Sequence, residues 1–262
     1  MKTKLASKNG YGLAGLMVAL GISLIATASH VCAQSTVYNT TVGETNPITP
    51  EITTEQLKKI LAEHSGPVLD VRFPQEFAIA HIPGSINVYE KEVETITQRF
   101  PDKATSIVLY CNGPFCGKSK RVSAELVKRG YTNVKRYQLG LPVWRALGNT
   151  VQTDSAGIQY VTASDKTAVF VDARSHAEFE QGSMPGAVNI LAGEAEQANE
   201  PTDGRLPHKD KGTRVIVFAT DPKDARKVAE EIAKKAYWNS SYFGGTTDEL
   251  RTAGLWQQKT PK

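Results

Sequence analysis

The residues most able to perform chemistry lie together in one short segment, YCNGPFCGKS, at positions 110–119. This segment contains two of the three cysteines of the chain, Cys111 and Cys116. A cysteine is a strong nucleophile only as the thiolate, and its ordinary pKa of about 8.5 falls near cations or at the start of a helix. The surrounding elements therefore decide whether Cys111 is reactive.

The flanking sequence predicts a strand before Cys111 and a helix after it. SIVLY at 106–110 is a buried apolar run, and SKRVSAELVKRG at 119–130 has helical periodicity. Backbone N–H groups at a helix start attract anions, and Gly113 and Gly117 let the loop curl close to the sulfur. With Lys118, Lys120 and Arg121 nearby, we expect a stabilised thiolate and interpret Cys111 as a nucleophile rather than a small packed side chain.

Cys116 is open to two interpretations. It is either a resolving thiol that reacts with Cys111 or forms a regulatory disulfide with it, or a packing residue. Four residues separate the two cysteines, so they do not form a C-x-x-C pair. Two cysteines without that spacing or a nearby histidine pair are too few ligands for zinc. We expect no metal site and no cofactor.

The rest of the first half alternates between helix and strand signals. Thr53 and Gln56 form a predicted capping box at the start of a helix that ends near Gly66. Strands alternating with helices predict an α/β fold with a parallel sheet covered by helices. The expected strands are 67–71, 85–88, 106–110 and 133–137; the expected later helices are 74–80, 90–100, 119–130 and 142–147.

The second half repeats the first, and over the segment 68–88 the offset is a constant 102 residues. VLDVRFPQEFAIAHIPGSINV at 68–88 matches VFVDARSHAEFEQGSMPGAVNI at 169–190, and SIVLYC at 106–111 matches RVIVFA at 214–219. Ala219 therefore stands at the position of Cys111, followed by a loop with Asp221 and Asp224. The matching pairs are Asp70/Asp172, Arg72/Arg174, Glu76/Glu178, Phe77/Phe179, Pro83/Pro185, Gly84/Gly186 and Asn87/Asn189.

The repeated D-x-R…E-F…P-G-x-x-N segment resembles the rhodanese (sulfurtransferase) family, as does the strand that ends in Cys111. The resemblance implies two tandem rhodanese-like domains, each a parallel sheet flanked by helices. It also implies transfer of a sulfane sulfur from a small anionic donor, such as thiosulfate or polysulfide, through a Cys111 persulfide to a thiol or protein acceptor. The second domain, with Ala219, is expected to be inactive and structural.

The loop departs from the usual family pattern C-x-x-G-x-[RT]-[ST]. Its first hydroxyl, Ser119, comes eight residues after Cys111, so the loop is two residues longer and resembles a bacterial subgroup with C-N-G-P-x-C-x-x-S loops. This puts thiosulfate in question as the donor but leaves sulfur transfer as the expectation. The implied substrate and persulfide cradle consists of Asn112, Gly113, Pro114, Phe115, Cys116, Gly117, Lys118 and Ser119.

Two other functions are compatible with this loop. A protein that binds sulfur or an anion for a partner, without catalysis, would need the same cradle. A Cys-dependent phosphatase is more distant, because its C-x5-R signature needs an arginine where this chain has Gly117.

The first 33 residues have the features of an export signal. Lys2, Lys4 and Lys8 precede the apolar stretch 13–25, and Val31-Cys32-Ala33 offers a cleavage site. We expect a periplasmic or otherwise extracytoplasmic protein without a stable membrane anchor. The predicted divisions are 1–33 signal peptide, 34–50 flexible linker, 51–148 first domain, 149–158 linker and 159–258 second domain.

Charge argues against nucleic-acid binding. Removing residues 1–33 takes away three lysines and no acids, which lowers the formal net charge from +4 to +1. No basic stripe remains to match a phosphate backbone.

The remaining polar residues are interpreted as structural. Asp70 and Arg72 recur as Asp172 and Arg174 in the domain that lacks the cysteine, so we expect a fold-stabilising ion pair. We also expect Arg72 near the pocket mouth. Trp144 is expected in the core. Surface or loop positions are expected for His64, His81, His176 and His208, and a surface loop for 191–212.

Overall fold

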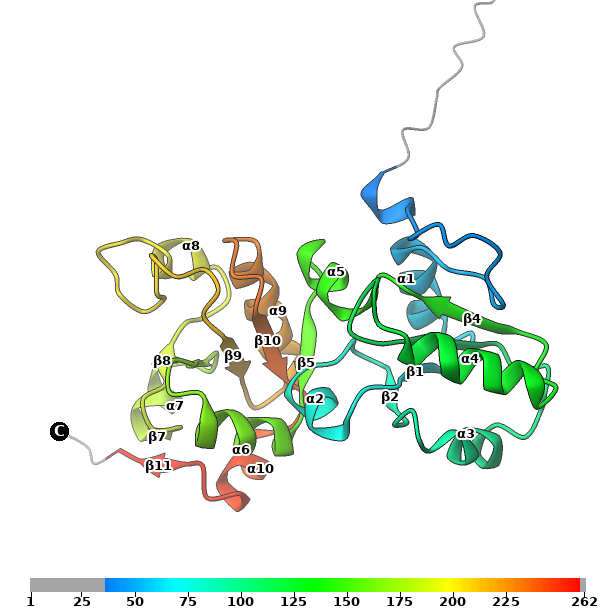
Figure 1. Ribbon diagram of the computed structural model, residues 1–262. Coiled ribbons are helices and arrows are strands. Elements are labelled where there is room, and N and C mark those ends of the chain that lie inside the picture. The colour runs from blue at the N-terminus through cyan, green and yellow to red at the C-terminus, as the bar shows by residue number, and fades with distance from the viewer. Residues whose placement is uncertain (1–35, 260–262) are drawn as a thin grey trace, which may run out of the picture. The chain divides into compact units, whose positions relative to one another are not determined.

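The computed structural model describes residues 36–259, and the segment Ser35–Lys262 forms one compact unit. The predicted signal peptide lies outside the described residues. Two parallel sheets, one from each repeat, organise this unit (Figure 1). The expected fold class is thus confirmed: two α/β domains, each with a parallel sheet flanked by helices.

The first sheet has the order β2-β1-β3-β4, and all neighbours are parallel. Its strands are short because only their buried cores are extended. They are β1 (Val68–Asp70), β2 (Ile86–Asn87), β3 (Ile107–Tyr110) and β4 (Val134–Tyr137), and the helices are α1 (Thr54–Glu63), α2 (Pro74–Ile79), α3 (Val93–Arg99), α4 (Lys118–Lys128) and α5 (Gly140–Ala146).

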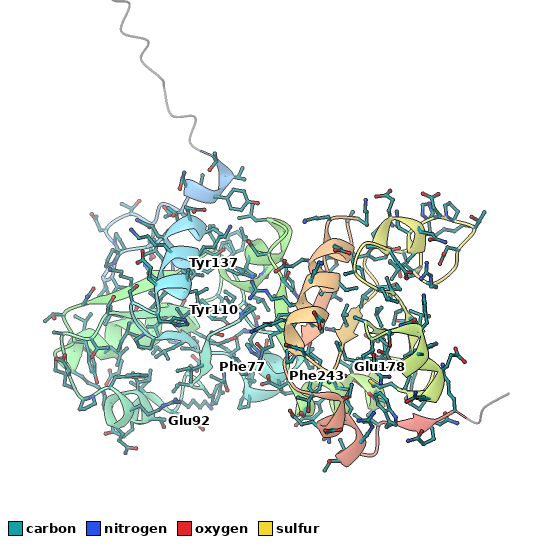
Figure 2. The ribbon with its side chains drawn as sticks, turned by 180° about the vertical axis from the view of Figure 1, so that it is seen from behind. Phe77, Glu92, Tyr110, Tyr137, Glu178 and Phe243 are labelled. Atoms are coloured by element: carbon teal, nitrogen blue, oxygen red, sulfur yellow. The ribbon has the colours of Figure 1, made fainter. Side chains whose placement is uncertain are left out.

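Alternation along β3 assigns each side chain to one of two cores. Val108 and Tyr110 pack on the face covered by α1 and α5, with Tyr137 beside them. Figure 2 shows the two tyrosines close to α1. Ile107 and Leu109 face the opposite core, with α3 and α4. A period of two residues places Cys111 on this second face, against α4.

The second sheet has the order β5-β10-β9-β6-β8, also parallel throughout. Helices α8 and α9 cover one face, and α6 and α10 pack on the other. The strands are β5 (Val151–Thr153), β6 (Val169–Asp172), β8 (Val188–Asn189), β9 (Val215–Phe218) and β10 (Ser240–Phe243); the helices are α6 (Ser155–Ser164), α7 (His176–Gln181), α8 (Ala195–Ala198), α9 (Pro222–Ala233) and α10 (Thr247–Thr252). A separate antiparallel pair joins β7 (Gly182–Ser183) to β11 (Gln257–Gln258), and a short 3-10 helix, η1 (Val37–Asn39), precedes α1.

Three segments expected as linkers or loops are more ordered than their composition suggests. The linker 149–158 contains β5 and the start of α6. The segment expected as a flexible linker, here called the lead-in (described from residue 36 to 50), packs on the first domain. Thr49 is buried, and the Glu51 carboxylate accepts hydrogen bonds from the backbone N–H groups of residues 42–44. The insertion 191–212 contains α8 and buries Leu206. Tertiary burial overrides polar composition in each case.

The two domains meet where α2 packs on α6. Gly157 of α6 approaches α2 so closely that an added Cβ would lie 2.0 Å from the carbonyl oxygen of Ala78. His81 is buried there, stacked on Phe77 (Figure 2). Its backbone exchanges two hydrogen bonds with Gln152. The expected surface or loop position of His81 is therefore wrong, because this contact encloses it.

Candidate active site

Cys111 follows the last residue of β3 and is 1% exposed. Its side chain belongs to the core formed with α3 and α4. The carboxyl end of a parallel strand is the usual place for a ligand site in an open α/β sheet. The structure thus gives Cys111 the strand-end position that the sequence predicts.

A close backbone approach shapes the loop that follows. The N–H of Leu141 donates to the carbonyl oxygen of Cys111 at 3.1 Å, and Gly140 lies directly against the chain of Cys111 and Gly113. An added Cβ at Gly140 would lie 2.4 Å from that carbonyl oxygen, and both glycines have positive φ, +66° and +115°. Only glycine fits these two positions without strain.

The Sγ atom of Cys111 has two polar neighbours. It lies 3.4 Å from the carbonyl oxygen of Cys116, to which the thiol donates, and 3.4 Å from the hydroxyl of Ser119. Burial and the contact with Cys116 raise the pKa of Cys111 to about 11, although the Ser119 hydroxyl and amide act to lower it. The expected stabilised thiolate is therefore absent in this state, because burial outweighs the helix-start groups.

A network of hydrogen bonds between buried polar side chains supports the loop. The Gln138 side-chain amide donates to the carbonyl oxygens of Pro114 and Cys116 at 3.0 and 3.1 Å, and its oxygen accepts from Ser119. Arg136 donates to the same Gln138 oxygen at 2.7 Å. These bonds hold the loop in its closed form.

The network of buried polar side chains continues into the lead-in. Arg136 is 2% exposed and donates to Thr49 and to the Glu44 carboxylate, which also accepts from Lys120 of α4. Sequence reasoning missed Gln138, Arg136 and Glu44. A signal existed for Gln138: β3 and β4 are parallel neighbours in the predicted fold, so residues that follow each strand meet at one edge.

Arg72 reaches the loop from the neighbouring strand. Its guanidinium pairs with Asp70, at 2.5 Å for the shortest contact, and also donates to the Asn112 side chain at 3.4 Å. Asn112 in turn donates to Glu76 at 2.5 Å. Arg72 therefore combines an ion pair with a contact to the loop.

The second domain repeats this ion pair in detail. Arg174 pairs with Asp172, and Asn189 donates to the backbone oxygens of both residues, as Asn87 does to Asp70 and Arg72. Because the pair recurs without a cysteine nearby, its main role is to join the strand end to the following turn. The structural interpretation of the Asp-x-Arg motif is consistent with this geometry.

The remaining loop residues differ in how far they are exposed to solvent. Gly117 precedes α4, where Lys118 begins the helix and lies 3.9 Å from Glu76. Cys116 is half-buried and packs beside Cys111, and both thiols are free. Phe115 is fully exposed at the tip of the loop. The loop of the first domain thus exposes an aromatic side chain to solvent four residues after Cys111.

The corresponding loop of the second domain has no thiol. Ala219 is buried, and the Asp221 carboxylate caps α9 by accepting from the N–H of Lys223 at 2.8 Å. A carboxylate thus occupies the helix start that would otherwise attract an anion.

The described residues show neither a membrane-crossing element nor a metal cluster. Within residues 36–259 no helix combines the length and apolar character needed to cross a bilayer. The same range contains no group of three His, Cys, Asp or Glu side chains placed to hold a metal ion.

Comparison with known families decides the family of the chain. The model of the rhodanese-like domain matches twice, at residues 53–147 and 159–248. The chain belongs to the rhodanese-like domain family. The match covers both repeats, including the one with Ala219.

Curated relatives of this rhodanese-like protein are sulfurtransferases. It is 39% identical over 69 residues to thiosulfate sulfurtransferase PspE of Escherichia coli, covering 26% of this chain and 64% of PspE. It is 30% identical over 112 residues to the thiosulfate:glutathione sulfurtransferase of Saccharomyces cerevisiae, covering 36% of this chain and 76% of that protein. These relatives support a sulfurtransferase family.

A solved structure of similar fold is the thiosulfate sulfurtransferase from Pseudomonas aeruginosa. It is 22% identical, with a TM-score of 0.35, and the match covers 79% of this chain and 43% of that one.

Proposed function

We propose that this protein is an exported sulfurtransferase that carries a sulfane sulfur on Cys111. The observation that carries the proposal is the position of Cys111, the thiol at the β3–α4 turn inside a glycine-shaped loop of a rhodanese-like domain. The relatives named for thiosulfate support an anionic donor.

The proposed reaction has two steps. The Cys111 thiolate attacks the outer sulfur of the donor, and the donor's S–S bond breaks with its electron pair leaving on the rest of the donor. An acceptor thiolate then attacks the outer sulfur of the persulfide, which returns the electron pair to Cys111. Because Cys111 is 1% exposed, we propose that the loop moves aside for each step.

Export is the second part of the proposal. Its support is the charged start, apolar core and Val-Cys-Ala site of residues 1–33, which leave a mature chain starting near Gln34. The intact mass of protein from fractionated cells tests it; an uncleaved N-terminus in the membrane fraction would contradict it.

The test of the chemistry is a pair of substitutions. Cys111→Ser is expected to reduce turnover of thiosulfate and of polysulfide by more than about 10³-fold, because no other residue replaces the nucleophile. Adding Ala219→Cys to that variant is expected to leave turnover at background, because Asp221 occupies the adjoining helix start. Steady-state assays with both donors and intact-mass detection of the persulfide give the result. Turnover retained by Cys111→Ser would reject the assignment.

A noncatalytic role for the same cradle gives a different result. A sulfur-binding protein without turnover would still form the persulfide in wild type but would release no product to an acceptor thiol.

A further inference from the structure

A pocket of about 400 Å³ adjoins the Cys111 loop on the side away from α4. Asn112, Leu141 and Pro142 form one wall, and Arg214 and Trp238 of the second domain contribute the other. Leu141 is hydrogen-bonded to Cys111 through the backbone. The pocket is in the size range of sites for organic ligands and larger than an inorganic oxyanion needs.

Three guanidinium groups line this pocket, and two of them have carboxylate partners. Arg72 pairs with Asp70, and Arg214 Nε lies 3.2 Å from Asp165 Oδ2. The third, Arg145, is different: among residues 36–259 its Nε and Nη2 atoms are buried without a hydrogen-bond partner. The pocket therefore contains one positive charge that the described part of the protein leaves uncompensated.

The surroundings of Arg145 make this charge costly. Burial, followed by the positive charges of Arg214 and Arg72, lowers the pKa of Arg145 to about 10. The guanidinium remains charged at neutral pH, so the half-buried Arg145 side chain carries a positive charge whose Nε and Nη2 groups are buried and unsatisfied. Buried polar groups in native structures generally have a partner, which is a protein group, a water molecule or a bound ion.

One carboxylate of the chain also lines the pocket, but it is engaged elsewhere. Glu76 accepts from the Asn112 side chain at 2.5 Å and from the backbone N–H of Phe73 at 3.2 Å, and it lies 3.9 Å from Lys118. It does not contact Arg145 in the described structure. The described residues therefore offer Arg145 no anionic partner.

We propose that this pocket binds an organic anion. Its carboxylate or sulfonate group lies on Arg145 and Arg214, and its apolar part lies against Leu141, Pro142 and the half-exposed indole of Trp238. Charge-assisted bonds to guanidinium groups supply the affinity for the anionic group. An inorganic anion would use only the guanidinium side of the pocket.

The place of the pocket suggests what the anion does there. Asn112 follows Cys111 directly, so a ligand in the pocket lies beside the loop that holds the nucleophile. Because the Cys111 thiol packs against α4, on the other face of the sheet from Leu141, the anion would serve as the sulfur donor or the acceptor thiol only after the loop moves as proposed above. This role rests on the proposed function, whereas the binding itself does not.

The binding test uses benzenesulfonate as the probe and the full mature chain carrying Cys111→Ser, so that the result is independent of turnover. Tryptophan fluorescence, with Trp238 in the pocket wall, and calorimetry at constant ionic strength report the dissociation constant. Arg145→Met in this background is expected to raise the dissociation constant by about tenfold or more. Arg129→Met, which removes an exposed arginine of the same domain, is expected to change it less than about twofold.

A stability measurement without ligand separates this site from a structural role. Arg145→Met is expected to unfold at the same or a higher temperature than its parent in dilute chloride buffer, because it removes an unpaired buried charge. It should also lose the increase in unfolding temperature that benzenesulfonate gives the parent.

Three outcomes would overturn the proposal. A lower unfolding temperature for Arg145→Met without ligand would show that the protein itself satisfies the guanidinium. Equal loss of affinity in Arg129→Met would show only a general effect of charge. Tighter binding of sulfate than of benzenesulfonate would remove the apolar part of the site. None of these depends on whether Cys111 transfers sulfur.

Discussion

At the residue scale, Cys111 is held in its thiol form by the closed loop. Burial and, after it, the Cys116 side chain raise the pKa of Cys111 and favour the thiol, whereas the Ser119 hydroxyl and amide favour the thiolate. The sequence shows the helix start and the cations near Cys111, which lower a thiol pKa. It does not show the burial of the sulfur, which raises the pKa. In this conformation the thiol is buried, and the proposed reaction therefore needs the loop to move.

The raised pKa predicts the pH dependence of thiol reactivity. With a pKa of about 11, only about 10⁻⁴ of Cys111 is thiolate at pH 7. In wild type, with the Cys111 and Cys116 adducts distinguished by peptide mass, alkylation of Cys111 by iodoacetamide is expected to rise roughly tenfold for each pH unit from 7 to 10. A cysteine-containing peptide, measured alongside, should level off above about pH 9. A plateau for Cys111 below pH 8 would show that the loop is open most of the time.

Cys116 allows a prediction about the fate of the persulfide. Its sulfur lies in the same cluster as Cys111, and its carbonyl oxygen already contacts Cys111 Sγ. If the Cys116 thiolate attacks the inner sulfur, a Cys111–Cys116 bond forms and hydrosulfide leaves with the electron pair. Cys116→Ala and Cys116→Ser are both expected to keep the persulfide longer and to release less sulfide.

Intact-mass time courses after one equivalent of donor measure this. Wild type should end two hydrogens lighter than the reduced chain, whereas both variants should not. The two variants serve as controls for each other, because they differ in polarity and size but both lack the thiol. Identical decay in all three proteins would make Cys116 a packing residue.

At the element scale, the contact between α2 and α6 joins the two domains. Its closeness depends on Gly157, which lies against the backbone of Ala78 and Ile79. A glycine inside a helix normally costs about 1 kcal/mol relative to alanine. Its presence here is explained by the approach of the two helices.

Gly157→Ala is therefore expected to destabilise the protein, although alanine favours a helix more than glycine does. The new Cβ would lie 2.0 Å from a backbone oxygen, which cannot move without shifting α2. The free energy of unfolding is expected to fall by about 1–3 kcal/mol, as for an overpacked core. Gln159→Ala, on the exposed side of the same helix, should change it by less than about 0.5 kcal/mol. Denaturant unfolding measures both; a stabilised Gly157→Ala would mean that the helices lie farther apart.

At the scale of the whole molecule, the duplicated fold could be predicted because its signals are local and occur twice. Asp70, Arg72 and Asn87 recur as Asp172, Arg174 and Asn189, and both sets make the same hydrogen bonds. The β3 and β9 runs are apolar throughout because both faces are covered. The strand-end position of Cys111 follows from the same pattern.

What could not be predicted depends on residues far apart in the chain. Arg145 and Arg214 meet only because the domains pack together, and nothing in either local sequence marks that meeting. The polar lead-in looks like a linker because Glu44 and Thr49 find their partner, Arg136, some ninety residues later. Composition reports the polarity of a segment but not whether its polar groups are paired.

The pairing of Glu44 predicts that the lead-in stabilises the first domain. Hydrogen bonds from Lys120 and then Arg136 lower the pKa of Glu44 below its ordinary value of 4.5. A carboxylate with a lowered pKa stabilises the fold above its ordinary pKa, and this contribution is lost as pH falls through the folded value. Glu44→Gln leaves the buried Arg136 guanidinium without its anion and is expected to reduce the free energy of unfolding by about 1–3 kcal/mol at pH 7. The difference from wild type should close as the pH falls below about 4.

Glu63→Gln, which removes an exposed i,i+4 partner of Lys59, should cost less than about 0.5 kcal/mol. Urea unfolding at several pH values measures all three chains. An equal effect of the two substitutions at pH 7 would show that the lead-in detaches from the domain in solution.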